Sequence, residues 1–272
     1  SIKDRFIFSN PFLSNMTKIQ RKIVAIGGGE IRTKGTLKID KYIIKLSNKK
    51  IPNVLFIPTA SSDHSGYCAH IKKYYQDFLK CRVDTLLLME EKPSIKLIKQ
   101  KIQKANIIYV GGGNTLQMMK LWRKLGVDKL LKKAWKDGTV LCGISAGSIC
   151  WFDSGHSDSM SFYNSKSWKY INVKGLGFVK GVHCPHYNGE TLNIPRKSHF
   201  RAMMQKISGI GIAIDNNAAI AFIDDKYQVI TSKKDAKAFQ VYKRNGKVIS
   251  KSILQDTKLR DVKELYLKNN KK

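Results

Sequence analysis

One ten-residue segment constrains the fold more than any other: Leu141-Cys142-Gly143-Ile144-Ser145-Ala146-Gly147-Ser148-Ile149-Cys150. The segment begins as an apolar strand, passes through Gly-x-Ser-x-Gly and continues as a helix-compatible stretch, which is typical of a nucleophile elbow. Small residues are needed on both sides of Ser145 because the chain turns from strand to helix within one residue. The turn points the N–H of Ala146 and the positive helix end at the oxygen that gains charge in acyl transfer. The segment indicates a hydrolase, although the same pentapeptide also occurs in tight turns without chemistry.

A glycine-rich loop offers a second donor for that oxygen. Residues 105–110 predict a buried strand, and Gly111-Gly112-Gly113-Asn114-Thr115 then opens a predicted helix over 116–125. Glycines let backbone N–H groups approach a ligand closely, so we expect Gly112 or Gly113 to share the oxyanion with Ala146. The loop lacks the third glycine of a dinucleotide fingerprint and the Gly-Lys-Ser/Thr of a phosphate-binding loop. We therefore expect no cofactor, neither metal nor organic.

Two histidines compete for the role of general base. His183 and His186 follow a short apolar run, and because a strand alternates its faces, we expect only one of them to reach Ser145. Two carboxylates, Asp153 and Asp158, lie between the serine and the histidines. We take Asp158 as the orienting acid because it lies in a polar loop. The chain order Ser, Asp, His is one that catalytic triads use.

Three motifs together resemble, in order and spacing, the serine peptidase family of dipeptidase E and cyanophycinase. They are Gly111-Gly112-Gly113-Asn114-Thr115, Gly143-Ile144-Ser145-Ala146-Gly147 and Cys184-Pro185-His186-Tyr187. The resemblance spans about residues 22–248. It implies a three-layer α/β/α sandwich like that of the class I glutamine amidotransferases, with a serine in place of their cysteine.

The resemblance also implies roles for residues. The family's nucleophile falls on Ser145, its histidine on His186 and its acid on Asp158. Asp153 or Glu190 would be the acid if the loop is arranged differently. Dipeptidase E looks for an N-terminal aspartate, whereas cyanophycinase takes a β-linked aspartyl-arginine polymer, and the three motifs do not distinguish these substrates.

The spacing of apolar runs predicts the same class of fold. Runs separated by helical stretches predict a parallel sheet covered on both faces. These runs are residues 22–26, 54–57, 83–88, 107–110 and 140–142. From residue 211 to 249 the period changes, and we expect antiparallel strands that extend the sheet. We thus predict an α/β fold, a three-layer α/β/α sandwich with a mostly parallel sheet and antiparallel C-terminal strands. One peptidase domain would span 21–250, between an N-terminal extension at 1–20 and a basic C-terminal tail at 251–272.

The formal net charge of +30 raises the question of a polyanionic partner. Lysines are spread along the chain, so we expect a solvated surface and no specific nucleic-acid site. We expect neither a signal peptide nor a membrane span, and five scattered cysteines without a CxxC pair argue against a disulfide framework. We expect a cytoplasmic protein whose partner is a short peptide substrate, with no membrane contact; the sequence does not give the oligomeric state.

The predicted mechanism is acyl transfer. His186 takes the proton of Ser145, Asp158 orients the histidine, and the serine attacks a peptide carbonyl. Water then hydrolyses the acyl-enzyme.

If the family's preference for an acidic residue holds, a cation should face the substrate carboxylate. Arg196 and Arg201 follow the histidine segment and are the candidates, because guanidinium groups bind carboxylates in a bidentate manner. Gln117, in the helix after the glycine loop, is a further candidate contact.

Two other functions stay open at this stage. An α/β-hydrolase esterase would share the elbow, but that fold carries an HGGG-type loop, and here no histidine precedes Gly111. A non-catalytic member of the amidotransferase-like fold would use the same crevice for binding alone.

Overall fold

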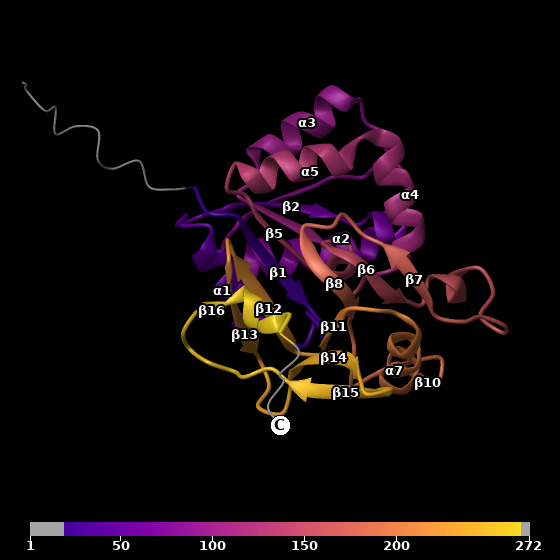
Figure 1. The fold of residues 1–272 in the computed structure, drawn as a ribbon. Helices are drawn as coiled ribbons and strands as arrows, with labels where there is room; N and C mark the ends of the chain where they lie inside the picture. Colours follow the sequence, from indigo (N-terminus) through magenta and orange to yellow (C-terminus); the bar gives the residue numbers. More distant parts are fainter. Residues whose placement is uncertain (1–18, 268–272) are drawn as a thin grey trace, which may run out of the picture.

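The computed structural model describes residues 19–267 of the chain (Figure 1). An eight-stranded sheet and a six-stranded sheet carry most of the structure, and a two-stranded hairpin lies beside them. Residues 1–18 of the expected N-terminal extension and residues 268–272 of the expected tail lie outside the described residues.

The eight-stranded sheet has a parallel core and an antiparallel edge, in the order β16-β13-β12-β1-β5-β4-β2-β3. The predicted parallel sheet is thereby confirmed. The parallel strands are β1 (Lys22–Ile26), β5 (Val140–Ile144), β4 (Ile107–Val110), β2 (Asn53–Ile57) and β3 (Arg82–Thr85). The antiparallel strands are β12 (Ala218–Ile223), β13 (Lys226–Thr231) and β16 (Arg260–Asp261).

Helices cover both faces of this sheet, because alternate side chains of each parallel strand are buried on opposite sides. On one face, Ile108 and Leu141 belong to a core shared with α3, α4 and α5. On the other face, Ile107 and Cys142 pack with α1 and α2. This is the predicted three-layer α/β/α sandwich (Figure 1). The helices are α1 (Leu37–Leu46), α2 (Ser65–Lys72) with its π-helical continuation η3 (Lys73–Phe78), α3 (Ile95–Lys104), α4 (Thr115–Leu125), α5 (Val127–Lys136), α6 (Ala146–Ile149) and α7 (Arg196–Lys206).

The six-stranded sheet corrects part of the sequence-based expectation. Two C-terminal strands, β11 and β14, join this sheet and not the parallel one, and β11 runs parallel to β8. Only β12 and β13 extend the first sheet as expected, together with β16. In order, the strands of the second sheet are β15 (Lys247–Ser252), β14 (Ala238–Arg244), β11 (Ile210–Ile214), β8 (Val179–Cys184), β6 (Phe152–Ser157) and β7 (Ile171–Lys174).

Short elements lie between or after the longer helices and strands. They are η2 (Thr59–Ser61), η4 (Ser159–Phe162), the hairpin of β9 (Glu190–Thr191) and β10 (Ile194–Pro195), and η5 (Val262–Leu265). The loops after β4 and β5 leave the carboxyl edge of the parallel sheet, where ligands bind in open α/β folds. The glycine loop and the serine segment therefore meet at one edge.

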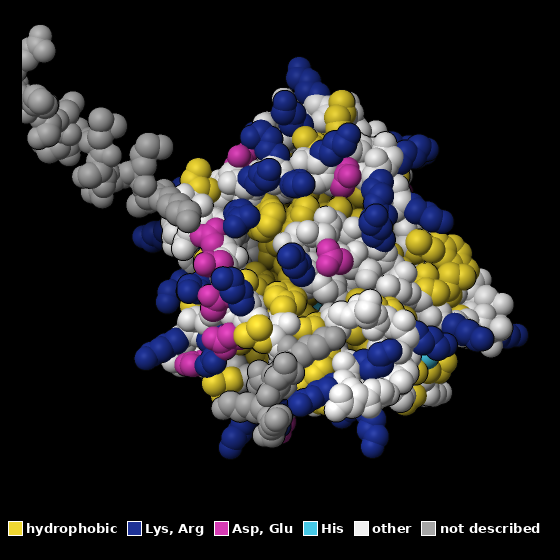
Figure 2. Space-filling model, viewed as in Figure 1, with side chains coloured by type: hydrophobic (Ala, Val, Ile, Leu, Met, Phe, Trp, Pro, Cys, Tyr) yellow, Lys and Arg dark blue, Asp and Glu magenta, His cyan; other side chains and the backbone are white. Residues whose placement is uncertain are grey.

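The chain carries an excess of Lys and Arg, 50 against 20 Asp and Glu. Lys and Arg side chains are scattered over the face seen in Figure 2 and do not form a single stripe. Within residues 19–267, no helix combines the length and hydropathy needed to cross a bilayer. All five cysteine thiols lie in the described part of the chain and are free.

The structure places most of the expected tail, residues 251–272, inside the fold. Lys251 and Ser252 are paired in β15, and Arg260 of β16 pairs with Tyr227 of β13. Leu265 is 1% exposed and belongs to the larger hydrophobic core. The tail boundary at 250 therefore needs correction, because strand pairing and apolar burial continue well beyond it.

Replacement of Leu265 tests this packing. Leu265→Ala should lower the free energy of unfolding by about 2–4 kcal/mol, because it leaves a cavity in the core. Leu267→Ala is the matched control, since Leu267 is 59% exposed, and should cost less than about 0.5 kcal/mol. Urea unfolding followed by circular dichroism measures both. Equal effects of the two substitutions would show that the C-terminal segment does not pack on the core.

Candidate functional site

Ser145 lies in a strained turn between β5 and α6. Its φ is 57° and its ψ is −115°, a conformation that non-glycine residues avoid. A Cβ at Gly143 would lie 2.2 Å from the carbonyl oxygen of Gly147, and a Cβ at Gly147 would lie 2.1 Å from that of Val110. Only glycine fits at either position. The predicted strand–elbow–helix unit is therefore confirmed.

The glycine loop lies directly against Ser145. A Cβ at Gly112 would lie 3.2 Å from the Cβ of Ser145 and 3.7 Å from its Oγ. Gly113 has a φ of +136°, and a Cβ there would lie 2.2 Å from the carbonyl oxygen of Ala60. The loop is tied to the same carbonyl by the N–H of Asn114, at 2.7 Å. Glycine is required because the backbone itself forms the wall beside the serine.

Backbone donors near the serine are not all equivalent. The Gly112 N–H points at the hydroxyl oxygen of Tyr67 over a long 3.4 Å contact. Within residues 19–267, the N–H groups of Gly113 and Ala146 have no hydrogen-bond acceptor, and Ala146 is the first residue of α6, where such orphan donors are normal. The pair Gly113 and Ala146 is thus available to an incoming oxyanion, and Gly112 becomes available if Tyr67 moves aside.

His186 is anchored beside Ser145 by the end of β1. The N–H of Ser145 donates to the Ile26 carbonyl oxygen at 3.3 Å, and the N–H of His186 donates to the next carbonyl, that of Gly27, at 2.9 Å. His186 has a φ of 50°, so Pro185 is followed by a sharp change of direction that separates this histidine from the face used by His183. The two residues with the expected nucleophile and base roles therefore attach to consecutive residues of one strand end.

Asn216 holds the imidazole of His186. Its Oδ1 lies 2.5 Å from the Nδ1 of His186, and since an amide oxygen only accepts, Nδ1 carries the proton and Nε2 is the basic nitrogen. Asn216 is itself fixed by its own N–H, which donates to Oδ1 of Asn188 at 2.8 Å. A Cβ at Gly28 would lie 2.0 Å from Asn216 Oδ1, so Gly28 makes room for this pair.

Both ring nitrogens of His183 make hydrogen bonds within the core. The side chain is fully buried, with Nδ1 2.8 Å from the carbonyl oxygen of Ile212 and Nε2 2.8 Å from the Oγ of Ser148. The same Ser148 Oγ donates to the carbonyl oxygen of Ser145 at 2.7 Å. His183 therefore supports α6 through Ser148, and both of its ring nitrogens have partners other than the Ser145 hydroxyl.

Burial keeps both imidazoles neutral. It lowers the pKa of His183 to about 3 and that of His186 to about 4. The positive charge of Arg196 lowers the His186 pKa further, while the Asn216 hydrogen bond and the negative charge of Asp158 oppose these effects. At neutral pH, His186 thus presents an unprotonated Nε2. Within residues 19–267, no three His, Cys, Asp or Glu side chains are arranged to hold a metal ion together.

Asp158 does not contact His186, which corrects the predicted role of this carboxylate. Its Oδ2 accepts hydrogen bonds from Nη2 of Arg196 at 2.5 Å and from Oγ1 of Thr191 at 2.9 Å. Arg196 is 2% exposed, and a buried guanidinium needs a carboxylate partner. Asp158 therefore neutralises a buried cation.

The two fallback carboxylates do not contact His186 either. Asp153 Oδ2 accepts the N–H of Gly181 at 2.8 Å. Glu190 lies in the β9–β10 hairpin, opposite Pro195. The hydrogen-bond partner of the imidazole is thus an amide, and the sequence analysis missed it. Asp215-Asn216-Asn217 resembles an ordinary turn, and only the spatial pairing with the histidine segment distinguishes it.

The arginines expected to face a substrate carboxylate are also committed to internal contacts. Arg196 binds Asp158 as described. Arg201 donates to Oγ of Ser250 at 2.7 Å and to the carbonyl oxygen of Val248 at 2.6 Å, which ties α7 to β15. Both guanidinium groups tie segments of the fold together, and the expected contact with a substrate carboxylate stays a prediction.

Gln117, in contrast, lines a cavity of about 410 Å³ beside the glycine loop. Its Nε2 donates to Oγ of Ser62 at 2.9 Å. A second cavity of about 370 Å³ contains the Glu30–Arg32 ion pair and shares His64 and Tyr67 with the first. The first hollow borders Gly113 and Asn114, and the second reaches Tyr67, whose hydroxyl oxygen accepts the N–H of Gly112. Together they form the candidate substrate crevice.

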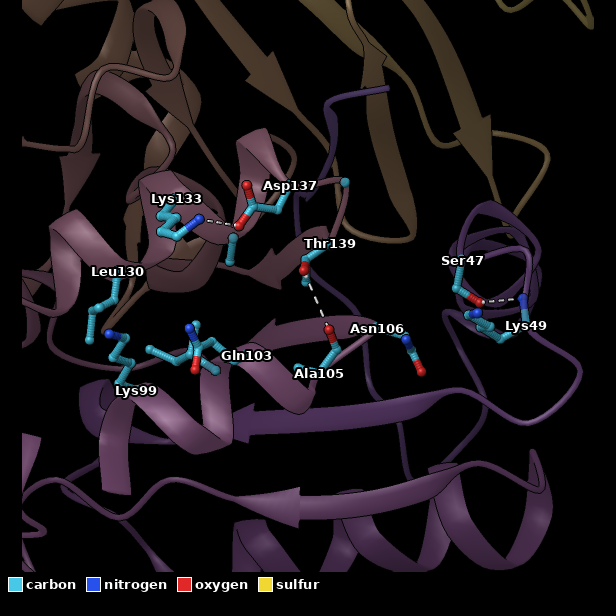
Figure 3. Close-up of a pocket in the computed structure, with 13 residues that line it drawn as sticks. Ser47, Lys49, Lys99, Gln103, Ala105, Asn106, Leu130, Lys133, Asp137 and Thr139 are labelled. Carbon is cyan, nitrogen blue, oxygen red and sulfur yellow. Dashed lines mark hydrogen bonds and ion pairs between the residues drawn. The ribbon is translucent and has the colours of Figure 1, made fainter. Parts of the chain in front are cut away.

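A third cavity, of about 330 Å³, lies far from this chemistry (Figure 3). Its lining includes Ala105 and Thr139, which lie just before the first residues of β4 and β5. Lys133 there is paired with Asp137 at 2.7 Å. The elbow and glycine loop follow the opposite ends of the same strands, so this hollow is not part of the site.

Comparison with known proteins agrees with the geometry. The model of peptidase family S51 matches residues 23–230. The uncharacterized peptidase YgaJ of Bacillus subtilis (strain 168) is 38% identical over 225 residues, which cover 81% of this chain and 92% of that protein. The uncharacterized peptidase Lmo0363 of Listeria monocytogenes is 30% identical over 190 residues, covering 69% and 89%. The crystal structure of a peptidase from an acI-B1 Actinobacterium has the same fold, with a TM-score of 0.70 at 20% identity, and covers 90% of this chain and 98% of that one. The chain therefore belongs to peptidase family S51, the dipeptidase E family that its motifs resemble, and is a peptidase.

Proposed function

We propose that this peptidase is of the serine type and hydrolyses short peptides through Ser145 and His186. The observation that carries the proposal is the anchoring of both residues on Ile26 and Gly27, at the end of β1. A serine in a strained elbow, a neutral imidazole and unpaired backbone donors are the components that acyl transfer requires. These components converge at the carboxyl edge of the sheet.

The proposed reaction proceeds in two halves. Nε2 of His186 takes the proton of Ser145 as Oγ forms a bond to the peptide carbonyl carbon, and the N–H groups of Gly113 and Ala146 hold the resulting oxyanion. The C–N bond then breaks, and the imidazolium returns the proton to the leaving amine. In the second half, His186 removes a proton from water as the water oxygen forms a bond to the acyl carbon. The bond from that carbon to Oγ then breaks, and the imidazolium returns the proton to Oγ, which releases the acid product and regenerates Ser145.

Asn216 takes the orienting role in this proposal. Its amide oxygen fixes the imidazole tautomer without adding a negative charge, as in the Cys-His-Asn arrangement of papain-like proteases. A histidine paired with an amide lacks the carboxylate that would raise its pKa. The low pKa of His186, about 4, is consistent with such a site.

The preference for an N-terminal aspartate, implied by the family resemblance, is not part of this proposal. Arg196 and Arg201 are bound to other residues of the fold, so neither supplies the expected cation. The proposed substrates are short peptides without that requirement. Non-catalytic binding in the same crevice is the alternative that loss of Ser145 tests directly.

Removal of the nucleophile and of the base gives the first test. Ser145→Ala and His186→Ala should each lower kcat/KM for dipeptides by at least about a thousandfold. His183→Ala is the control for general damage to the elbow and should retain more turnover, although it loses thermal stability. Dipeptide hydrolysis, labelling by a fluorophosphonate probe and circular dichroism melting measure the three effects. Inactivation by His183→Ala together with full turnover in His186→Ala would reverse the assignment of the base.

The pH dependence tests the role of Asn216. Since the unprotonated form of His186 is the active one, kcat/KM should stay constant as the pH falls from neutral and decline only as it approaches about 4. Asn216→Asp adds a negative charge beside the imidazole and should raise its pKa by about 1–3 units. The acid limb of the profile should therefore move to higher pH, while Asn216→Ala lowers turnover without that upward shift.

Asp158→Asn separates the two candidate orienting residues. It should destabilise the fold through Arg196 and leave the acid limb largely in place. An acid limb that moves in Asp158→Asn but not in Asn216→Asp would return the orienting role to Asp158. NMR titration of the imidazole of His186 provides the same comparison without turnover.

A further inference from the structure

We infer that the cavity beside the glycine loop is the specificity pocket of this peptidase and takes a large uncharged side chain, with aromatic side chains preferred, next to the cleaved bond. This inference rests on the proposed serine mechanism, because it takes Ser145 as the point where the peptide is cut. It differs from the aspartate preference that the family resemblance implies.

The position of the cavity relates it to the cleaved bond. Gly113 and Asn114 line it. The preceding residue, Gly112, lies against Ser145, since a Cβ there would be 3.7 Å from the serine Oγ. Gly113 therefore borders the cavity, and its N–H is one of the donors proposed to hold the substrate carbonyl. The side chain of a residue flanking that carbonyl is the group within reach.

The chemistry of the lining excludes a charged occupant. No Asp, Glu, Lys or Arg contributes to it. Polar groups come from hydroxyls, amides and one imidazole, and Gln117 Nε2 is already bound to Ser62. A carboxylate buried here would lose water without gaining a counter-charge, which is unfavourable. The full lining is Ala60, Ser61, Ser62, His64, Tyr67, Gly113, Asn114, Gln117, Phe162 and Tyr163.

Two aromatic side chains at the mouth favour an aromatic occupant. Phe162 is 57% exposed and Tyr163 is 59% exposed. Both therefore present apolar surface to solvent beside the cavity. Phe162 is the last residue of η4 and Tyr163 follows it. This turn is tied to the start of α4 because Oγ of Ser159 accepts the N–H of Leu116 at 3.0 Å. Rings held in this way can pack against a substrate ring. The volume of about 410 Å³ is within the range of small-ligand pockets.

The neighbouring cavity has a different character. It holds Arg32 and Glu30, paired at 2.9 Å, and it shares His64 and Tyr67 with the specificity pocket. Charge is thus confined to the other hollow of the crevice. If this enzyme prefers acidic side chains after all, Arg32 is the group that would bind them.

A peptide panel with matched variants tests the inference. The panel consists of X-Leu and Leu-X dipeptides in which X is Phe, Asn, Ala or Asp. For one of the two orientations, wild-type kcat/KM should be at least about tenfold higher with Phe than with Asp. Gln117→Lys should shift the Phe/Asp ratio toward Asp by about tenfold or more, and Gln117→Glu should shift it the other way. Lys120→Gln, an exposed change of charge on the same helix, should leave the ratio unchanged.

The aromatic contribution has its own variant. Combined Phe162→Ala and Tyr163→Ala should lower kcat/KM for the Phe peptides several-fold more than for the Ala peptides. Ile95→Ala removes an equally exposed apolar side chain, 58% accessible, at the start of α3 and should lower neither. An unchanged Phe/Ala ratio in the double variant would remove the aromatic preference.

Binding measurements separate this inference from the proposed mechanism. Calorimetric titration of the Ser145→Ala protein with Phe-Leu, Leu-Phe and the Asp counterparts reports the preference without turnover. Hydrolysis that survives Ser145→Ala would overturn the serine mechanism. The titration would still measure whether the pocket prefers Phe or Asp peptides. The pocket assignment would be overturned if the wild type bound or cleaved the Asp peptides better and if Arg32→Gln removed that preference. The mechanism would be left intact.

Discussion

The carbonyl oxygens of Ile26 and Gly27 organise this site, because they hold the backbone N–H groups of Ser145 and His186 at one strand end. β1 is the central strand between the parallel core and the antiparallel edge of the first sheet. It is buried along its whole length, so its end is a rigid point of attachment. The nucleophile arrives from the neighbouring parallel strand and the histidine from the second sheet. The two sheets therefore meet at the proposed site, and their mutual packing sets the distance between Ser145 and His186.

Neutrality is the second constraint on the site. Buried His183 and the half-buried His186 and Asn216 carry no charge at neutral pH, while the buried Arg196 is paired with the half-buried Asp158. An isolated guanidinium in this position would depress the basicity of His186 strongly. Pairing with Asp158 limits that effect while keeping the carboxylate away from the imidazole. The net result is a weakly basic histidine oriented by an amide.

Sequence reasoning found the parts of the site that depend on local backbone geometry. The turn around Ser145 requires glycine at positions 143 and 147. The helix of residues 95–104 and the parallel strands follow from the periodic spacing of apolar residues. The second sheet was missed in large part because β6 (FDSGHS) alternates weakly and is half polar. The internal partners of Asp158, Arg196 and Arg201 were missed for a related reason. Side-chain pairing between segments far apart in the chain is not encoded in any local pattern.

Strain in the elbow explains why so much of the structure is fixed around it. A non-glycine residue with a φ of 57° costs on the order of 1–3 kcal/mol, and the surroundings must hold it in place. Gly147 packs on the Val110 carbonyl, and Ser148 links the elbow carbonyl to His183. These contacts come from strands in both sheets. The specificity pocket, in contrast, is built from η2, η4 and the start of α4, with exposed side chains at its mouth. The residues that line it lie outside the steric limits of the elbow, so in the proposed enzyme the residues that perform the reaction are separate from those that select its substrate.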